Sequence, residues 1–190
     1  MSGKLIKGLI ALVVVVFAAA YLGSPVIASQ NLVKAAKAGD EAALDRLVDF
    51  PAFRTSLKEE LNVRLVAEMR ADLGDSGRGN VLGGLGMILA PALISGAVDA
   101  FVTAPAIATM VRTAEPPSTT PTGNVTPPPA DKGADEDKVR RSYGYRDLNT
   151  FVVTLRRDDK PAEQVDLLMQ RRGLFAWKLA GIDLTPTEPA

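Results

Sequence analysis

The feature that most constrains this chain is an uncharged, largely apolar stretch over residues 8–33, which follows Lys4 and Lys7. A helix needs about 20 apolar residues to cross the hydrocarbon core of a bilayer, and residues 5–27 supply that length. Tyr21 stands towards the far end of this segment, where membrane-spanning helices are enriched in tyrosine. The sequence therefore predicts contact with a membrane through residues 5–27.

Two interpretations of this segment remain open. The favoured one is an uncleaved, single-pass anchor. The other is a cleavable secretion signal, in which Leu9 to Phe17 form the apolar region and Ala18 to Ala20 form a small-residue cleavage site. Both interpretations export the rest of the chain, because Lys4 and Lys7 favour a cytoplasmic N-terminus. The C-terminal domain is therefore expected outside the cytoplasm.

Composition narrows the possible functions. The chain has no cysteine and no histidine, which removes disulfides, thiolate chemistry, the usual zinc ligands and the commonest nucleophile–base pairs. The 22 basic and 22 acidic side chains cancel, so no overall field attracts nucleic acid. We expect no enzyme activity, no catalytic residue, no metal, no cofactor and no nucleic-acid partner.

Residues 29–75 follow the pattern of short amphipathic helices. Gly39 is a plausible helix end, and Asp40 can cap the helix that follows. A longer helix begins near Pro51 and has apolar residues at every fourth position: Phe53, Leu57, Leu61, Leu65, Met69 and Leu73.

The Asp-Phe-Pro sequence before that longer helix could form either a functional site or a structural hinge between two helices. Proline fits the first turn of a helix but disfavours helical geometry in the residue before it. Asp49 can accept backbone N–H groups at the new N-terminus, and Arg54 can pair with Asp49. We therefore interpret Asp49, Phe50, Pro51 and Arg54 as a structural hinge.

Residues 81–111 contain one charged side chain, Asp99. Ser95, Asp99 and Thr103 recur every four residues, so they would line one stripe of a helix. We favour a helix that is mostly buried in the domain, with this stripe facing water. A membrane-surface helix and a second membrane span are the alternatives.

The C-terminal part changes to a period of two, which is typical of strands. Residues 115–137 are rich in proline and are expected to be a disordered insert. In residues 138–184, Phe151, Val153 and Leu155 alternate with more polar neighbours, and the same pattern recurs twice after turns. The sequence therefore predicts a three- or four-stranded antiparallel meander.

The predicted fold is α+β. The helices of residues 29–114 would pack on the apolar face of the sheet of residues 138–184, in one domain that follows the segment of residues 1–28 and precedes a tail of residues 185–190.

Two segments of the sequence resemble a known protein family. The segments "GDEAALDRLVDFPAFRTSL" and "FAWKLAGIDL" resemble the bacterial domain-of-unknown-function family 2939, which has no assigned activity. The resemblance implies a protein of the bacterial inner (cytoplasmic) membrane with a periplasmic domain. The order of helices and a curved sheet is also similar to the cone-like nuclear-transport-factor-2-like fold, which hosts both enzymes and inert modules around one pocket.

The candidate binding residues follow from such a pocket. Asp99, Tyr143, Tyr145 and Trp177 could surround an apolar ligand in a concave sheet, although core packing also explains Trp177. A second candidate is a basic patch for anionic lipid headgroups, made of Arg140, Arg141, Arg156, Arg157, Arg171 and Arg172.

The function expected from these observations is a non-catalytic, membrane-anchored envelope module that binds a partner protein or an apolar ligand. One alternative is a hydrolase or isomerase that uses carboxylates such as Asp49 or Asp99 in a pocket. Another is a purely structural envelope component without a pocket.

Overall fold

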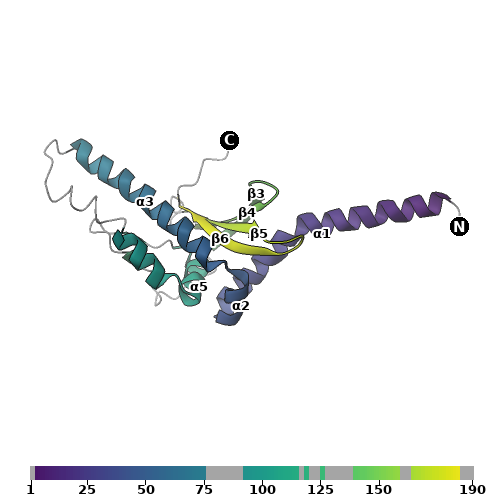
Figure 1. Cartoon of the computed structure of the whole chain (residues 1–190), viewed down its shortest axis with the longest axis horizontal. Coiled ribbons are helices and arrows are strands. Elements are labelled where there is room, and N and C mark those ends of the chain that lie inside the picture. The colour runs from purple at the N-terminus through teal and green to yellow at the C-terminus, as the bar shows by residue number, and fades with distance from the viewer. Residues whose placement is uncertain are drawn as a thin grey trace.

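A computed structural model describes six parts of the chain: residues 3–75, 92–115, 118–119, 125–126, 139–158 and 164–184. Helices come first and strands follow, as Figure 1 shows. The described helices are α1 (Gly3–Ala38), α2 (Glu41–Leu47), α3 (Phe50–Asp75), an unlabelled helix (Ala92–Phe101) and α5 (Ala104–Thr113). The α+β class predicted from the sequence is confirmed.

Helix α1 has two environments along its length. Residues 6–20 are exposed, and this half projects away from the rest of the molecule (Figure 1). From Ser24 onward one face is buried in the domain, through Ser24, Ser29, Leu32, Ala35 and Ala36. Among the described helices, α1 by itself is long and apolar enough to cross a membrane. The domain boundary expected at residue 28 lies inside this one continuous helix.

The two turns after α1 follow from local chemistry. Gly39 takes a positive φ of 64°, which glycine adopts without steric cost, and Asp40 Oδ1 accepts the backbone N–H of Ala43 at 2.9 Å. Both predictions are confirmed. After α2, Val48 is extended and forms a parallel bridge with Leu179 before α3 begins.

Among the described residues, four strands form an antiparallel meander in the order β3 (Val139–Tyr145), β4 (Thr150–Arg157), β5 (Gln164–Arg171) and β6 (Trp177–Asp183). The four-stranded form of the prediction is therefore the right one. Phe151, Val153 and Leu155 on β4 all point to the buried face, as their period of two requires.

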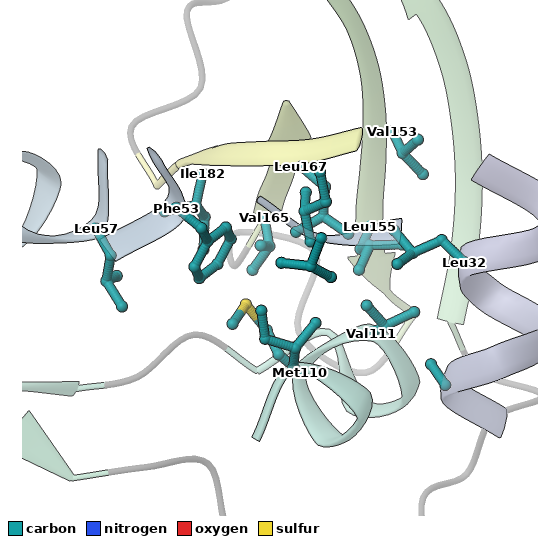
Figure 2. Packing of buried hydrophobic residues seen from close by; sticks show 14 of the residues in the cluster. Leu32, Phe53, Leu57, Met110, Val111, Val153, Leu155, Val165, Leu167 and Ile182 are labelled. Atoms are coloured by element: carbon teal, nitrogen blue, oxygen red, sulfur yellow. The ribbon is translucent and has the colours of Figure 1, made fainter. Parts of the chain in front are cut away.

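The core lies between this face of the sheet and the helices. Figure 2 shows Leu32 of α1, Phe53 and Leu57 of α3, and Met110 and Val111 of α5 converging on the strands. The strand side chains in this view are Val153, Leu155, Val165, Leu167 and Ile182. Burial of apolar area on this scale is the main force that holds helices to sheet.

Helix α3 also covers the open edge of the sheet. Ser56 Oγ accepts the backbone N–H of Ile182 at 3.0 Å, and Glu60 Oε1 accepts that of Leu184 at 3.1 Å. The helix lies so close to β6 that a Cβ added to Gly181 would be 2.7 Å from Ser56 Oγ. The edge of β6 is therefore protected from pairing with another chain.

The prediction of one mostly buried helix within residues 81–111 was wrong in two respects. Two helices, Ala92–Phe101 and α5, are bent by 92° at a break, because Pro105 belongs to the first turn of α5 and proline begins helices readily. Asp99 is exposed and Val98 is buried, as expected, but Leu93 and Phe101 are 48% and 42% exposed, so the first of these helices is not mostly buried. Residues 81–91 lie outside the described residues.

The Pro-rich insert also falls mostly outside the described residues, so its disorder stays a prediction. Its described parts are the short strands β1 (Ser118–Thr119) and β2 (Val125–Thr126), which pair antiparallel.

Candidate ligand groove beside the first helix

A groove of about 530 Å³ lies where α1 enters the domain. Its walls are α1, the end of α2, and the start of β6 with the loop before it, which spans residues 172–176. The lining residues are Ala20, Ser24, Ile27, Ala28, Asn31, Arg46, Leu47, Arg172, Phe175, Ala176, Trp177 and Lys178. The groove therefore begins on the exposed half of α1 and continues onto the buried half.

The lining combines apolar walls with positive charge. Arg46, Arg172 and Lys178 are the charged members, and no carboxylate is among the described residues that line the groove. Arg172 is held by Asp49, with Nη2 2.7 Å from Oδ2. Within the described part of the chain, Arg46 and Lys178 form no ion pair. An apolar body with an anionic end would match this lining.

Trp177 lines the groove and is 3% exposed. Its indole Nε1 donates a hydrogen bond of 2.9 Å to Ser24 Oγ on α1. The Ser24 hydroxyl in turn donates to the carbonyl oxygen of Tyr21 at 2.8 Å. That carbonyl has lost its usual helical partner, because Pro25 has no N–H. A single serine thus ties α1 to β6 and satisfies the backbone beside the proline.

The structure brings three of the four predicted ligand residues together. Tyr145 packs edge-on against Trp177 with ring centroids 6.2 Å apart, and Tyr143 stacks on Phe151 at 6.4 Å. The Tyr145 hydroxyl donates to the carbonyl of Leu22 at 2.7 Å. Of these residues only Trp177 lines the groove. Tyr145 supports it by fixing α1 against the sheet.

Asp99 lies elsewhere. Its carboxylate pairs with Lys58 on α3, with Nζ 2.7 Å from Oδ1, and its side chain is 54% exposed. The expectation that Asp99 faces the same site as Trp177 is therefore wrong. It fails because the helix that carries Asp99 packs beside α3, and the polar stripe points away from the core.

Arg171 is the residue whose role the sequence did not reveal. Its guanidinium carbon lies 3.9 Å from the centroid of the Tyr21 ring and 4.2 Å from that of Trp177, so the group is sandwiched between α1 and β6. It also donates to the carbonyls of Leu148 at 3.0 Å and Leu174 at 2.7 Å. Cation–π contacts and charge-assisted hydrogen bonds stabilise this junction together.

The other arginines of the expected basic patch are dispersed. Arg140 pairs with Asp158 at 2.6 Å, Arg157 pairs with Glu115, and Arg156 donates to Gln164 at 2.8 Å. Most of these side chains therefore serve local contacts. The useful sequence signal was narrower: two arginines, Arg171 and Arg172, directly before the apolar turn "GLF".

The Asp49 to Arg54 segment forms the start of α3. Asp49 Oδ1 accepts the N–H of Ala52 at 3.2 Å, and the Asp49 N–H donates to the carbonyl of Leu179 at 2.8 Å. Arg54 does not pair with Asp49. Its Nη2 donates to the carbonyl of Val102 at 3.0 Å, and its guanidinium lies 5.7 Å from the centroid of the Phe50 ring.

A match to a family model sets this geometry in context. Residues 14–110 match the model described as "Protein of unknown function (DUF2939)", which covers about half of the chain. The chain belongs to this family. No curated protein and no solved structure matches. A bacterial origin and the likeness to the nuclear-transport-factor-2-like fold stay predictions.

The part that matches DUF2939 contains only one side of the groove. It begins at Val14 inside α1, includes α2 and α3, and ends at Met110 inside α5. The loop before β6 and β6 itself lie beyond the match. The α1 and α2 walls of the groove are therefore shared with the DUF2939 model, while Arg172, Phe175 and Trp177 are outside it.

The two carboxylates considered as catalytic candidates, Asp49 and Asp99, both form ion pairs in this DUF2939 chain. Asp49 holds Arg172, and Asp99 holds Lys58 on α3. Lys58 comes nine residues after Asp49, so the two ion pairs are about 13 Å apart along the axis of α3. Across the described ranges, no group of three carboxylates is placed to hold a metal ion. The pKa of Asp147 is lowered, first by the backbone N–H of Asn149, but this residue sits on an exposed turn.

Proposed function

We propose that this DUF2939 protein is a membrane-anchored, non-catalytic module that binds an apolar ligand in the groove beside α1. The observation that carries the proposal is the position of the groove. It lies on the same helix as the exposed apolar half, immediately after that half ends. A ligand that resides in a bilayer could therefore reach the groove without crossing water.

The chemistry of the lining narrows the ligand class. Ile27, Phe175 and Trp177 offer apolar and aromatic surface suited to a hydrocarbon chain. Arg46 and Lys178 supply positive charge at the same groove, suited to an anionic headgroup. We therefore propose an anionic amphiphile, such as an acidic phospholipid, as the ligand class.

The anchor and the compartment belong to the same proposal. We take α1 as an uncleaved single span of a bacterial inner membrane, with the α+β domain on the periplasmic side, because Lys4 and Lys7 precede the apolar half. Contacts between Phe17 and Phe175, with ring centroids 5.6 Å apart, support an uncleaved helix. Cleavage after Ala20 would remove this packing.

The non-catalytic character is supported by the paired carboxylates. A general acid or base needs a free, positioned group with a suitable pKa, whereas Asp49 and Asp99 each face a cation. No observation in the described residues favours the hydrolase or isomerase alternative over binding.

The test is native mass spectrometry of the full chain, released from nanodiscs that contain phosphatidylglycerol and phosphatidylcholine. We expect one retained phosphatidylglycerol per wild-type chain. In Asn31→Trp, an indole on an exposed lining position would fill the groove and lower retention about tenfold, equivalent to about 1.4 kcal/mol.

The matched control is Gln30→Trp, which adds the same side chain to the neighbouring exposed position that does not line the groove. This variant should retain the lipid as the wild type does. Equal retention by wild type and Asn31→Trp, or no retained lipid in the wild type, would overturn the groove as a ligand site and favour a purely structural role.

A further inference from the structure

The β3–β4 and β5–β6 loops, which we call the two loop tips, expose large apolar side chains. Leu148 in the first loop is 68% exposed, and Leu174 and Phe175 in the second are 64% and 46% exposed. Single exposed leucines are ordinary on protein surfaces. Two adjacent turns that both present large apolar side chains are typical of a surface that meets a protein or a membrane.

Both loop tips lie beside the exposed half of α1. The Phe175 ring is 5.6 Å from that of Phe17 and 6.5 Å from that of Tyr21, centroid to centroid. In Figure 1 the end of the sheet that carries these turns approaches α1 where the helix leaves the domain. Phe17 belongs to the part of α1 assigned to the membrane, so the tips are continuous with that surface.

The length of the exposed half gives an independent reason. From Ile6 to Ala20 the helix has about 15 residues, which rise about 22 Å at 1.5 Å per residue. The hydrocarbon core of a typical bilayer is about 30 Å thick. The exposed half is therefore too short by roughly 8 Å, and the domain must begin inside the bilayer or its interface.

The two tips are built as one rigid surface. Arg171 donates to the carbonyls of both Leu148 and Leu174, and its backbone N–H donates to Asn149 at 2.9 Å. Asp147 Oδ1 accepts the N–H groups of Asn149 and Thr150 at 2.7 and 2.9 Å, which shapes the turn that presents Leu148. Little conformational entropy would be lost when such a surface meets a partner.

The side chains behind the tips have the composition of a membrane interface. Tyr21, Arg171 and Trp177 are stacked there, and tyrosine, tryptophan and arginine favour the level of the lipid headgroups. The charged side chains of the tips are compensated: Arg146 pairs with Asp183 at 2.9 Å, and Asp147 is bonded within its own turn. Arg172 pairs with Asp49, so each charged side chain of the two loop tips has a hydrogen-bonded partner.

We propose that Leu148, Leu174 and Phe175 are embedded in the outer part of the bilayer, so that the sheet docks directly on the membrane. The occupant of this surface is the lipid bilayer that holds α1. The inference rests on the proposed anchor, but it does not depend on a ligand in the groove.

The absence of cysteine allows a direct measurement of depth. Single cysteines at Leu148, Leu174, Val13 and Asp158 of the full chain would each carry a nitroxide, in nanodiscs of phosphatidylcholine and phosphatidylglycerol. Power saturation then compares collisions with oxygen, which concentrates in hydrocarbon, and with a water-soluble nickel chelate. Val13→Cys reports on the anchor, and Asp158→Cys reports on the opposite end of β4, about 25 Å from the tip.

We expect the oxygen-to-nickel accessibility ratio at Leu148→Cys and Leu174→Cys to exceed that at Asp158→Cys several-fold, with Val13→Cys higher still. If Val13→Cys is in hydrocarbon while both tips match Asp158→Cys, the docking surface is wrong and the anchor stands. If Val13→Cys is itself in water, the anchor and the docking surface both fail. All four positions are exposed, so circular dichroism should show an unchanged fold.

Discussion

Both halves of α1 carry large apolar side chains, but these side chains have different surroundings. Val14 and Leu32 are separated by about five helical turns, so they lie on the same side of the helix. Val14 is 60% exposed, whereas Leu32 is 1% exposed. One half has the protein core as its apolar partner, whereas residues 6–20 of the other half are all exposed and Phe17 meets the sheet at Phe175 within the described residues. The comparison teaches that an apolar sequence predicts burial, but it does not predict whether protein or lipid will cover the segment.

The largest expected effect comes from placing the same charge in each half. Leu32→Asp would bury a carboxylate in the core and destabilise the fold by at least about 4 kcal/mol. Val14→Asp would leave the domain intact and cost about 3 kcal/mol of membrane insertion. Thermal unfolding in detergent measures the first effect, and the membrane-bound fraction after alkaline extraction measures the second.

This pair of variants tests whether the two halves of α1 have different apolar partners. If Val14→Asp unfolds the domain as severely as Leu32→Asp does, the first half of α1 has a protein partner and not a lipid one. Val14→Leu is the apolar control and should change neither measurement.

The next effect concerns the junction between the halves, where Arg171 is sandwiched between Tyr21 and Trp177. Arg171→Met keeps the length of the side chain but loses two cation–π contacts and the hydrogen bonds to both loop tips. We expect destabilisation by about 1–3 kcal/mol, measured by denaturant unfolding. Arg156→Met on the exposed part of β4 is the control, and equal losses from both variants would contradict the role of Arg171.

A smaller effect should separate two buried serines of α1. Ser24 and Ser29 each donate to the carbonyl three residues earlier, but only Ser24 accepts the indole N–H of Trp177. Ser24→Ala should therefore cost about 1–2 kcal/mol by leaving that buried N–H unpaired, and Ser29→Ala should cost less. Unfolding followed by the fluorescence of Trp177, the one tryptophan in the sequence, measures both. Equal costs would show that the Trp177 hydrogen bond does not stabilise the junction.

The smallest effect is a pH dependence at the β3–β4 tip. The pKa of Asp147 is lowered by the N–H group of Asn149, so the carboxylate form stabilises the folded turn above the ordinary carboxyl pKa of about 4. This contribution is lost as the pH falls through the lowered pKa. The difference in melting temperature between wild type and Asp147→Ala should shrink on acidification below pH about 4 and stay constant from pH 6 to 8. A constant difference at all pH values would contradict it.

The elements that sequence predicts well are those set by neighbours along the chain. The period of two in Phe151, Val153 and Leu155 indicates a strand with one buried face, and Gly39 with Asp40 indicates a turn, because each signal lies within a few residues. The bend before Pro105 had an equally local signal. A long apolar run concealed it, since the run suggested one helix.

The groove and the loop tips could not be predicted in the same way. Arg171 meets Tyr21, Leu148, Leu174 and Trp177, which come from α1, two loops and β6, and only the folded chain brings them together. For Asp99, the local pattern was predicted correctly but the neighbouring element was not. Its spacing with Ser95 was read correctly as one stripe of a helix, but spacing cannot say which neighbour that stripe will face.

The continuity of α1 has a mechanical consequence. The helix runs from Gly3 to Ala38 with Pro25 inside it, and the junction of its two halves is tied to the sheet by the hydrogen bonds of Leu22 with Tyr145 and of Ser24 with Trp177. No flexible linker separates the membrane part of α1 from the core, so the domain cannot rotate independently of its anchor. A membrane-spanning helix tilts when the thickness of the bilayer changes. Because α1 is rigidly joined to the sheet, the sheet would rotate through the same angle as the helix.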